Sequence, residues 1–355
     1  MKSNLLLPAS LHFICGVTAL SYIPLQENHL WLCAGICTVL IFVGLVLFCR
    51  ERRAHPAIPF IVFFLCGALC AINHALGCEI HFFPSAGEKL FHGLKSAVNG
   101  AAFQKTSTRA LVQALLCGDR TLLPRDIQQD FKDSGAAHIL ALSGLHLAIL
   151  SGILKKALFF SGHSPKGKMI RNAFLIIAAA IYTLACGAGA SLVRAFIFIT
   201  ISAIADMCPQ RKAEAANRLL FAAMIQLTFH PEALQSLSFQ LSYLSCAGII
   251  TLKPYLSLWL PEDRGPARKI WESLSLSLSC QILTAPLVYL EFGTVPKYFL
   301  LTNLLALPVC EFLIHVSVCT IMLNALGVHP GALIWLGDIS ASLMLDILHI
   351  ISSIP

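Results

Sequence analysis

The stretch LWLCAGICTVLIFVGLVLFC, residues 30–49, decides the fold class, because it runs for twenty residues without a charge. An α-helix needs about 20 apolar residues to cross the hydrocarbon core of a bilayer. Residues 59–76 and 273–290 are of the same kind. Of the 355 residues, 57% are hydrophobic and only 12% are charged, about half of the roughly 25% that is usual in soluble domains. The sequence therefore predicts an all-α, polytopic membrane protein.

Eleven apolar segments are candidate spans, and we expect a transmembrane helical bundle of about ten or eleven spans. The segments are residues 5–25, 30–49, 57–76, 138–160, 172–187, 191–207, 215–229, 236–252, 273–291, 298–324 and 331–351. The first is long for the core of a signal peptide and is expected to remain as an uncleaved helix. Three parts follow from this division: N-terminal transmembrane helices over 1–76, an amphipathic segment over 77–137, and a transmembrane domain over 138–355.

Positive charge marks alternate connections between the spans. Fifteen of the 25 Lys and Arg residues fall in four connections, within 50–53, 155–171, 211–218 and 253–269. The opposite short connections carry almost none, which predicts that the basic loops and the N-terminus are cytoplasmic. Residues 77–137 are then extracytoplasmic. They are expected to form short amphipathic helices along the membrane surface, such as 106–116 with its leucines on one side.

The fourteen cysteines predict no disulfide framework. Most of them lie inside spans, where a free cysteine behaves as a small hydrophobe. Cys78 and Cys117 differ, because they lie in the long polar segment and could pair in an oxidising compartment. The string GHSPKGKM, residues 162–169, matches the first seven positions of a phosphate-binding loop motif. Its last position is Met169, whereas the motif requires a Ser or Thr that binds magnesium. With no nuclease or ATPase motif, we expect neither an enzyme nor a bound metal or cofactor.

The segment HILALSGLHLAIL, residues 138–150, carries polar groups at membrane depth: His138, Ser143, Gly144 and His146. Three interpretations stay open. The polar groups could line a pore or substrate path, Gly144 could allow close helix packing, or Ser143 and His146 could form a hydrolytic pair. His138 and His146 are eight positions apart, on the same side of a helix, but no acidic motif nearby completes a metal site.

A second polar segment is CGAGASLVRAF, residues 186–196. Gly187 and Gly189 loosen the helix, and Ser191 is a candidate cap for a new helix start. The N–H groups of such a start, together with the full charge of Arg194, predict an anion site, with phosphate as the natural ligand. Broken helices of this kind mark substrate paths in transporters. The alternative is an ordinary turn, with Arg194 reaching the lipid headgroups.

Two serine-rich stretches and a few acidic residues complete the polar inventory of the spans. Gln240 and Ser242 in QSLSFQLSYLSC, residues 235–246, are candidates for the substrate path, although small residues that join helices explain them equally well. Pro286 predicts a kink. Glu311 and His315, one helical turn apart, could relay protons or pair structurally.

Five stretches together resemble the competence domain of the ComEC family, the inner-membrane DNA-internalisation channels of bacterial natural transformation. They are ALLCGDR (114–120), DSGAAHILALSGLHLAIL (133–150), GAGASLVRAF (187–196), HPEALQSLSFQLSYLSCAGI (230–249) and TAPLVYLEFGTVP (284–296). The resemblance runs from about residue 100 to about 320. It implies that residues 138–355 form a competence-type transmembrane channel domain. Its signature positions are Gly118, Asp119, Arg120, His138, Ser143, Gly144, His146, Arg194, Phe239, Gln240, Leu241, Ser242, Pro286, Phe292 and Gly293.

The resemblance implies a channel that passes single-stranded DNA through the bacterial inner membrane into the cytoplasm. It also implies contact with membrane lipid, and separate DNA-receptor, nuclease and cytoplasmic helicase or motor proteins as partners. Copies of the chain could also form homo-oligomers. Fuller family members carry an oligonucleotide-binding-like module and a metallo-β-lactamase-like domain. Here only residues 77–100 occupy the first interval and the chain stops at Pro355, so any nuclease activity is expected to come from a partner or to be absent. The alternatives are a transporter of a small anion or another solute, and an intramembrane hydrolase.

Overall fold

The structure is a computed structural model that describes residues 6–21, 27–50, 57–77, 84–158, 164–207, 214–259 and 265–354. Every regular element in these ranges is a helix, and no strand occurs in them. The predicted all-α fold is therefore confirmed. The described residues fall into two compact units, one drawn from residues 1–82 and 210–243 and the other from 83–209 and 244–355.

Unit 1 combines the first three helices with a later part of the chain. It contains α1 (Leu6–Ser21), α2 (Glu27–Arg50), α3 (Ile58–Ala75), α11 (Ala215–Phe229), the 3₁₀ helix η2 (Pro231–Gln235) and the start of α12 (Leu237–Thr251). The backbones of α1 and α3 touch at two glycines. A Cβ on Gly16 would overlap the carbonyl oxygen of Phe64, and one on Gly67 would overlap that of Phe13. Small residues of this kind allow close helix approach in membranes.

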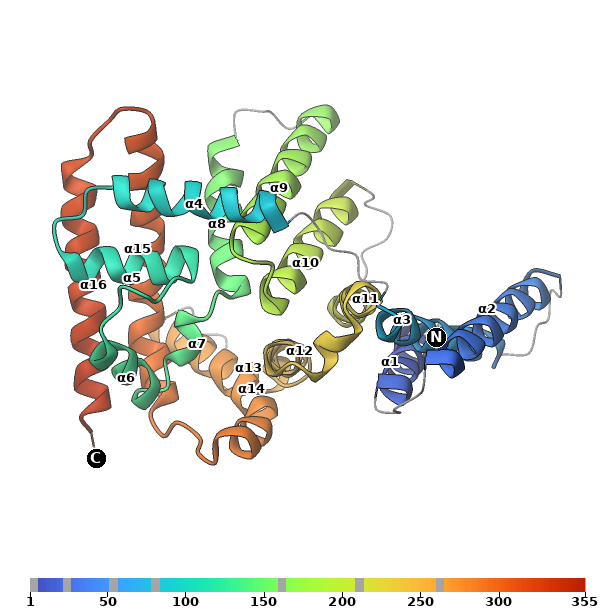
Figure 1. The fold of residues 1–355 in the computed structure, drawn as a ribbon. Helices are drawn as coiled ribbons and strands as arrows, with labels where there is room; N and C mark the ends of the chain where they lie inside the picture. Colours follow the sequence, from blue (N-terminus) through green and yellow to red (C-terminus); the bar gives the residue numbers. More distant parts are fainter. Residues whose placement is uncertain are drawn as a thin grey trace. The chain divides into compact units, whose positions relative to one another are not determined.

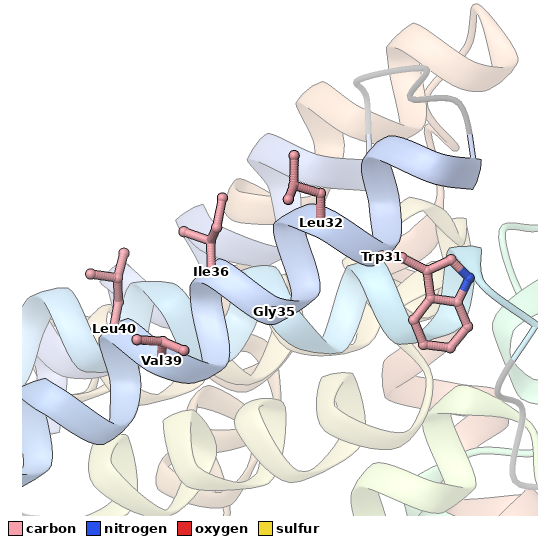
Figure 2. Close-up of a pocket in the computed structure, with 6 residues that line it drawn as sticks. All are labelled: Trp31, Leu32, Gly35, Ile36, Val39 and Leu40. Carbon is pink, nitrogen blue, oxygen red and sulfur yellow. The ribbon is translucent and has the colours of Figure 1, made fainter.

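One face of α2 is apolar and exposed. Figure 2 shows the shallow hollow along this face, lined by Trp31, Leu32, Gly35, Ile36, Val39 and Leu40. All six come from the same helix, and none has a charged side chain. On a helix long and apolar enough to cross a membrane, such a face is suited to contact with acyl chains, and it offers no polar group that could orient a ligand.

Unit 2 is built around two long helices near the C-terminus. It contains α4 (Pro84–Gly100), α5 (Thr106–Cys117), α6 (Arg125–Asp133), α7 (Ala137–Leu140), α8 (Gly144–Ala157), α9 (Pro165–Ala185), α10 (Ala190–Met207), α13 (Lys253–Ser257), α14 (Pro266–Phe292), α15 (Phe299–Ala325), α16 (Gly331–Ser352) and the rest of α12. In Figure 1, α4, α5 and α6 follow one another along the length of α15 and α16. The largest hydrophobic core joins these elements and includes Phe103, Leu111, Phe131 and Met344.

Helix α5 does not lie on a surface. Nine of its twelve residues are buried, including Leu111, Leu115 and Leu116 on the predicted apolar side and Thr108 and Gln113 elsewhere on the helix. It packs against α4, α15 and α16. Residues 84–140 do form short helices, as expected, but the prediction that 106–116 lies along the membrane surface is wrong, because protein covers both its apolar and its polar sides.

In the described part of the chain, six helices are long and apolar enough to cross a membrane: α2, α3, α9, α14, α15 and α16. Four more apolar helices, α1, α10, α11 and α12, are shorter. Every predicted span contains a helix, but the count of ten or eleven is not confirmed. The expected span 138–160 is interrupted, since α7 ends at Leu140 and α8 begins at Gly144. Helix α14, in contrast, continues through Pro286.

Candidate functional site

The break between α7 and α8 explains the polar residues of the 138–150 segment. Ser143 is extended, with φ −118° and ψ 171°, and α8 starts at the next residue. Its Oγ accepts a hydrogen bond from the N–H of Leu145 at 3.3 Å, and Nδ1 of His146 accepts one from the N–H of Ser143 at 3.2 Å. This is a capping box in which histidine replaces the usual Glu or Gln. Ser143 and His146 thus build a helix start inside an apolar segment.

Among the described residues, the same pair lacks the third group of a hydrolytic triad. Oγ of Ser143 lies 3.2 Å from Nδ1 of His146, within reach of proton transfer. However, Nδ1 also receives the Ser143 backbone N–H, and the buried Nε2 has no hydrogen-bond partner in the described part of the chain. No carboxylate orients the imidazole there. The contacts that the structure shows are those of a helix cap.

His138 belongs to α7 and lies apart from this cap. Its Nδ1 is 3.1 Å from the carbonyl oxygen of Gly135. Because α7 and α8 are separate helices, the expectation that His138 and His146 share one helix face is wrong. Among the residues that the structure describes, no group of three His, Cys, Asp or Glu side chains is arranged to hold a metal.

Arg194 is a residue of α10, and its guanidinium lies beside the start of α8. Its Nη1 donates to Sγ of Cys246 on α12 at 2.9 Å. Its Nη2 lies 3.4 Å from the point where a Cβ on Gly144 would stand, and the Cβ of Ala195 is equally near, at 3.3 Å. The half-buried guanidinium is therefore held between α8, α10 and α12. A full positive charge beside the free N–H groups of a helix start creates a local potential that favours an anion.

The turn before α10 differs from the expectation in one respect. Gly187 and Ala188 both adopt positive φ, +77° and +49°, so the chain does reverse here. Helix α10 begins at Ala190, which places Ser191 inside the first turn. The prediction that Ser191 caps the helix is therefore wrong, and Gly189 takes the position before the helix. The helix start that faces Arg194 is that of α8.

The stretch GDR, residues 118–120, ties three elements together. Gly118 ends α5 in the left-handed conformation, with φ +73°. The carboxylate of Asp119 accepts hydrogen bonds from Lys95 Nζ at 2.6 Å, from Gln113 Nε2 at 2.8 Å, and from the N–H and Oγ1 of Thr121 at 3.0 and 2.6 Å. The bond from Lys95, with those from Thr121, holds the pKa of Asp119 well below its usual range. Asp119 thus joins α4 to α5 and to the loop that follows α5.

Arg120 links this network to the helix break. Its Nη2 donates to the carbonyl oxygen of Leu140 at 2.9 Å. Leu140 is the last residue of α7, directly before the segment that leads to Ser143. The GDR stretch is therefore hydrogen-bonded to the end of α7, just before the segment that leads to the α8 start. Lys95 and Cys246 were not found from the sequence, because their partners are distant along the chain.

The remaining candidate residues lie away from this cluster along the chain. In unit 1, the ring of Phe239 packs on Tyr243 with centroids 4.3 Å apart, Nε2 of Gln240 donates to the carbonyl oxygen of Leu234 at 2.9 Å, and Ser242 is buried. In unit 2, Gly293 ends α14 with φ +70°, and Phe292 is exposed. Leu241 is half-buried.

Of the two cysteines in the polar segment, the structure describes only Cys117. Cys117 is a free, buried thiol whose pKa is raised to about 12, chiefly by burial. Cys78, its suggested partner, lies outside the described residues.

A family model described as competence protein matches residues 115–355. The chain belongs to this family. The match contains the GDR stretch, the helix break and Arg194. The family resemblance seen in the sequence is thereby confirmed for most of the chain.

Two curated relatives are similar to parts of the chain. ComE operon protein 3 of Bacillus subtilis (strain 168) is 28% identical over 133 residues, which are 38% of this chain and 17% of that protein. The uncharacterized protein YcaI of Escherichia coli (strain K12) is 26% identical over 213 residues, 58% of this chain and 28% of that protein. The chain therefore aligns with less than a third of either relative's length. No solved structure matches it.

Proposed function

We propose that this competence-family chain takes part in DNA uptake, as a channel that conducts one DNA strand across the bacterial inner membrane into the cytoplasm. The observation that carries the proposal is the position of Arg194 beside the N-terminus of the interrupted helix α8. Membership of the competence family and the six membrane-length helices support the same role. The basic connections favour an orientation with the N-terminus in the cytoplasm.

The chemistry of this position suits a passing phosphate better than a resident one. A single strand carries one negative charge per nucleotide, and each phosphate can meet the guanidinium and the helix N–H groups in turn. The cap by Ser143 already satisfies one of those N–H groups, and Nη1 of Arg194 is shared with Cys246. Contacts that are few and shared bind weakly, as conduction requires, because cargo must also leave.

In this proposal the chain is a conduit without catalytic activity of its own. A DNA receptor, a nuclease and a cytoplasmic helicase or motor are then separate proteins, and copies of the chain could assemble with one another. A transporter of a small anion is the second candidate, because the same guanidinium and helix start would bind any small oxyanion.

Uptake by proteoliposomes that contain the full chain tests the proposal. Fluorescent single-stranded DNA that becomes protected from added nuclease measures transport, and phosphate or chloride flux measures small-anion transport in the same vesicles. We expect Arg194→Gln to lower DNA uptake by tenfold or more and Arg194→Lys to retain part of it. Arg268→Gln is the matched control, because Arg268 forms an exposed pair with Glu272.

Three outcomes separate the candidates. Loss of DNA uptake in Arg194→Gln, with Arg268→Gln unaffected and insertion unchanged, supports the channel. Equal DNA uptake in Arg194→Gln and the wild type contradicts the phosphate role of Arg194. Small-anion flux that needs Arg194, in vesicles that take up no DNA, favours the second candidate.

A further inference from the structure

Large apolar side chains are exposed on the short helix α13 and directly after it. Tyr255, Leu258 and Trp259 are 70%, 79% and 73% exposed. The N–H of Leu258 donates to the carbonyl oxygen of Tyr255 at 3.1 Å, so the helical turn continues past Ser257. Residues three and four positions apart lie on one side of a helix, which brings these three side chains together as the α13 cluster. Contiguous exposed apolar side chains of this kind mark an interaction surface.

Helix α14 holds the α13 cluster in place. Nε1 of Trp271 donates to the carbonyl oxygen of Leu256 at 2.9 Å, and the rings of Trp259 and Trp271 stack with centroids 6.5 Å apart. Helix α13 packs against α14, and Figure 1 shows the two next to each other. Trp271 lies in the second turn of α14, so the α13 cluster has a defined position beside the beginning of that helix.

The charge distribution of α14 shows which part of this helix is suited to hydrocarbon. Residues 273–290 carry no charge, Glu272 precedes them and Glu291 follows them. This stretch of helix extends for about 27 Å, close to the ~30 Å thickness of the hydrocarbon core. Trp and Tyr are enriched where a span meets the headgroups, and here Trp271 lies at one end of the stretch and the exposed Tyr289 at the other. The α13 cluster therefore lies beside one end of a charge-free segment of membrane length.

The charged groups near the α13 cluster are complementary to lipid phosphate. Lys253 begins α13, and the exposed Lys269 lies in the first turn of α14. Among the residues that the structure describes, neither lysine forms an ion pair, whereas Arg268 pairs with Glu272 at 3.0 Å. Lysines near a membrane surface are attracted to its anionic lipids. The combination of Trp, Tyr and Leu with flanking lysines suits the layer between acyl chains and water.

We propose that the α13 cluster inserts into the headgroup layer of the bilayer and anchors the connection between α12 and α14 at one membrane face. The rings and Leu258 contact the upper part of the acyl chains, and Lys253 and Lys269 meet phosphate groups. Single-stranded DNA also binds aromatic and basic side chains. However, Leu258, the most exposed member, offers no ring for a base to stack on, and the cluster adjoins a membrane-length helix.

This inference rests on α14 as a membrane-spanning helix and not on the cargo of the chain. A failure of DNA uptake therefore leaves it standing, and it is tested without DNA.

Quenching by brominated phospholipids measures the depth of Trp259 in the full chain, reconstituted in vesicles. The chain has four tryptophans, so the fluorescence that Trp259→Phe removes is assigned to Trp259 by difference. We expect lipids brominated near the headgroup to quench this part about twofold more strongly than lipids brominated near the chain end. Quenching by aqueous iodide with none by either lipid would place Trp259 in water. Stronger quenching by the deeper bromines would place it in the hydrocarbon core, and either result would overturn the proposal.

Binding of a fluorescent single-stranded oligonucleotide separates lipid contact from nucleic-acid contact. Fluorescence anisotropy compares the wild type with Tyr255→Ala and Trp259→Ala in lipid nanodiscs, with helix content checked by circular dichroism. We expect both variants to match the wild type within about twofold, or no binding by any of the three, because lipid covers the cluster. A loss of affinity of about tenfold or more in both variants would assign the α13 cluster to nucleic acid and overturn the anchor.

Discussion

The Asp119 network allows the sharpest prediction of stability. Asp119→Ala removes an acceptor whose side chain is only 9% exposed and which bonds to Lys95, Gln113 and Thr121. Gln113 is fully buried, so its amide N–H groups lose their acceptor without gaining water. Breaking one partner of a buried charged pair costs about 3–5 kcal/mol. Because the Lys95 side chain is 33% exposed and remains partly hydrated, we expect the lower end, ~3 kcal/mol.

The assay is the apparent melting temperature of the full chain in detergent. In a unit of this size, 1 kcal/mol corresponds to about 2–4 °C, so Asp119→Ala should lower the melting temperature by roughly 6–12 °C. Asp119→Asn keeps an acceptor but loses the charge, and it should lower the value by about half as much. Asp133→Ala is the control, since Asp133 is exposed and bonds only to Gln129 in the described structure. A shift for Asp119→Ala no larger than that of Asp133→Ala would refute the reasoning.

The pH dependence of this contribution follows from the lowered pKa of Asp119. A carboxyl group whose pKa is lower in the folded than in the unfolded state stabilises the fold above the unfolded pKa, about 3.9, and loses this contribution as the pH falls towards the folded value. The difference in melting temperature between wild type and Asp119→Asn should therefore be constant from pH 5 to 8. A difference that disappears within that interval would contradict the assigned hydrogen bonds.

Two further substitutions test local contacts. Gly67→Ala should destabilise unit 1 by more than 1 kcal/mol, because the new Cβ overlaps the Phe13 carbonyl oxygen, whereas Gly35→Ala meets no atom within 4 Å and should be neutral in the same melting assay. Ser143→Ala should lower the free energy of unfolding by about 1 kcal/mol through loss of the cap, whereas Ser143→Asn should stay close to wild type. A fluorophosphonate probe should leave Ser143 unlabelled. Labelling of Ser143 that is abolished by His146→Ala would instead support a hydrolase.

Sequence patterns predicted the features of this fold that depend on neighbours along the chain. The absence of charge over residues 30–49 is enough to predict a membrane helix, because the cost of burying charge in lipid applies to each helix separately. The turn at Gly187 was expected for the same reason, since two glycines within three residues weaken a helix. In each case the deciding interactions lie within one helical turn or one apolar segment.

Features that depend on distant residues, or on an unusual local cap, were missed. The break before Ser143 contains no proline, and its cap uses histidine in place of the usual acidic or amide residue. The sequence therefore lacks the standard pattern that predicts a helix start. Burial of α5 depends on α15 and α16, about two hundred residues later. Arg194 was expected near a helix start, but only the folded chain shows that the start belongs to α8.

Unit 1 is discontinuous in sequence, and this has a consequence for biogenesis. Helices α1 and α3 are synthesised first, yet α11, which packs against both, leaves the ribosome only after α4 to α10. Until then the growing chain must keep an unfinished helix cluster in the bilayer without proteolysis or mispairing. The backbones of α1 and α3 touch directly at Gly16 and Gly67, so these two helices can pack together before α11 is synthesised.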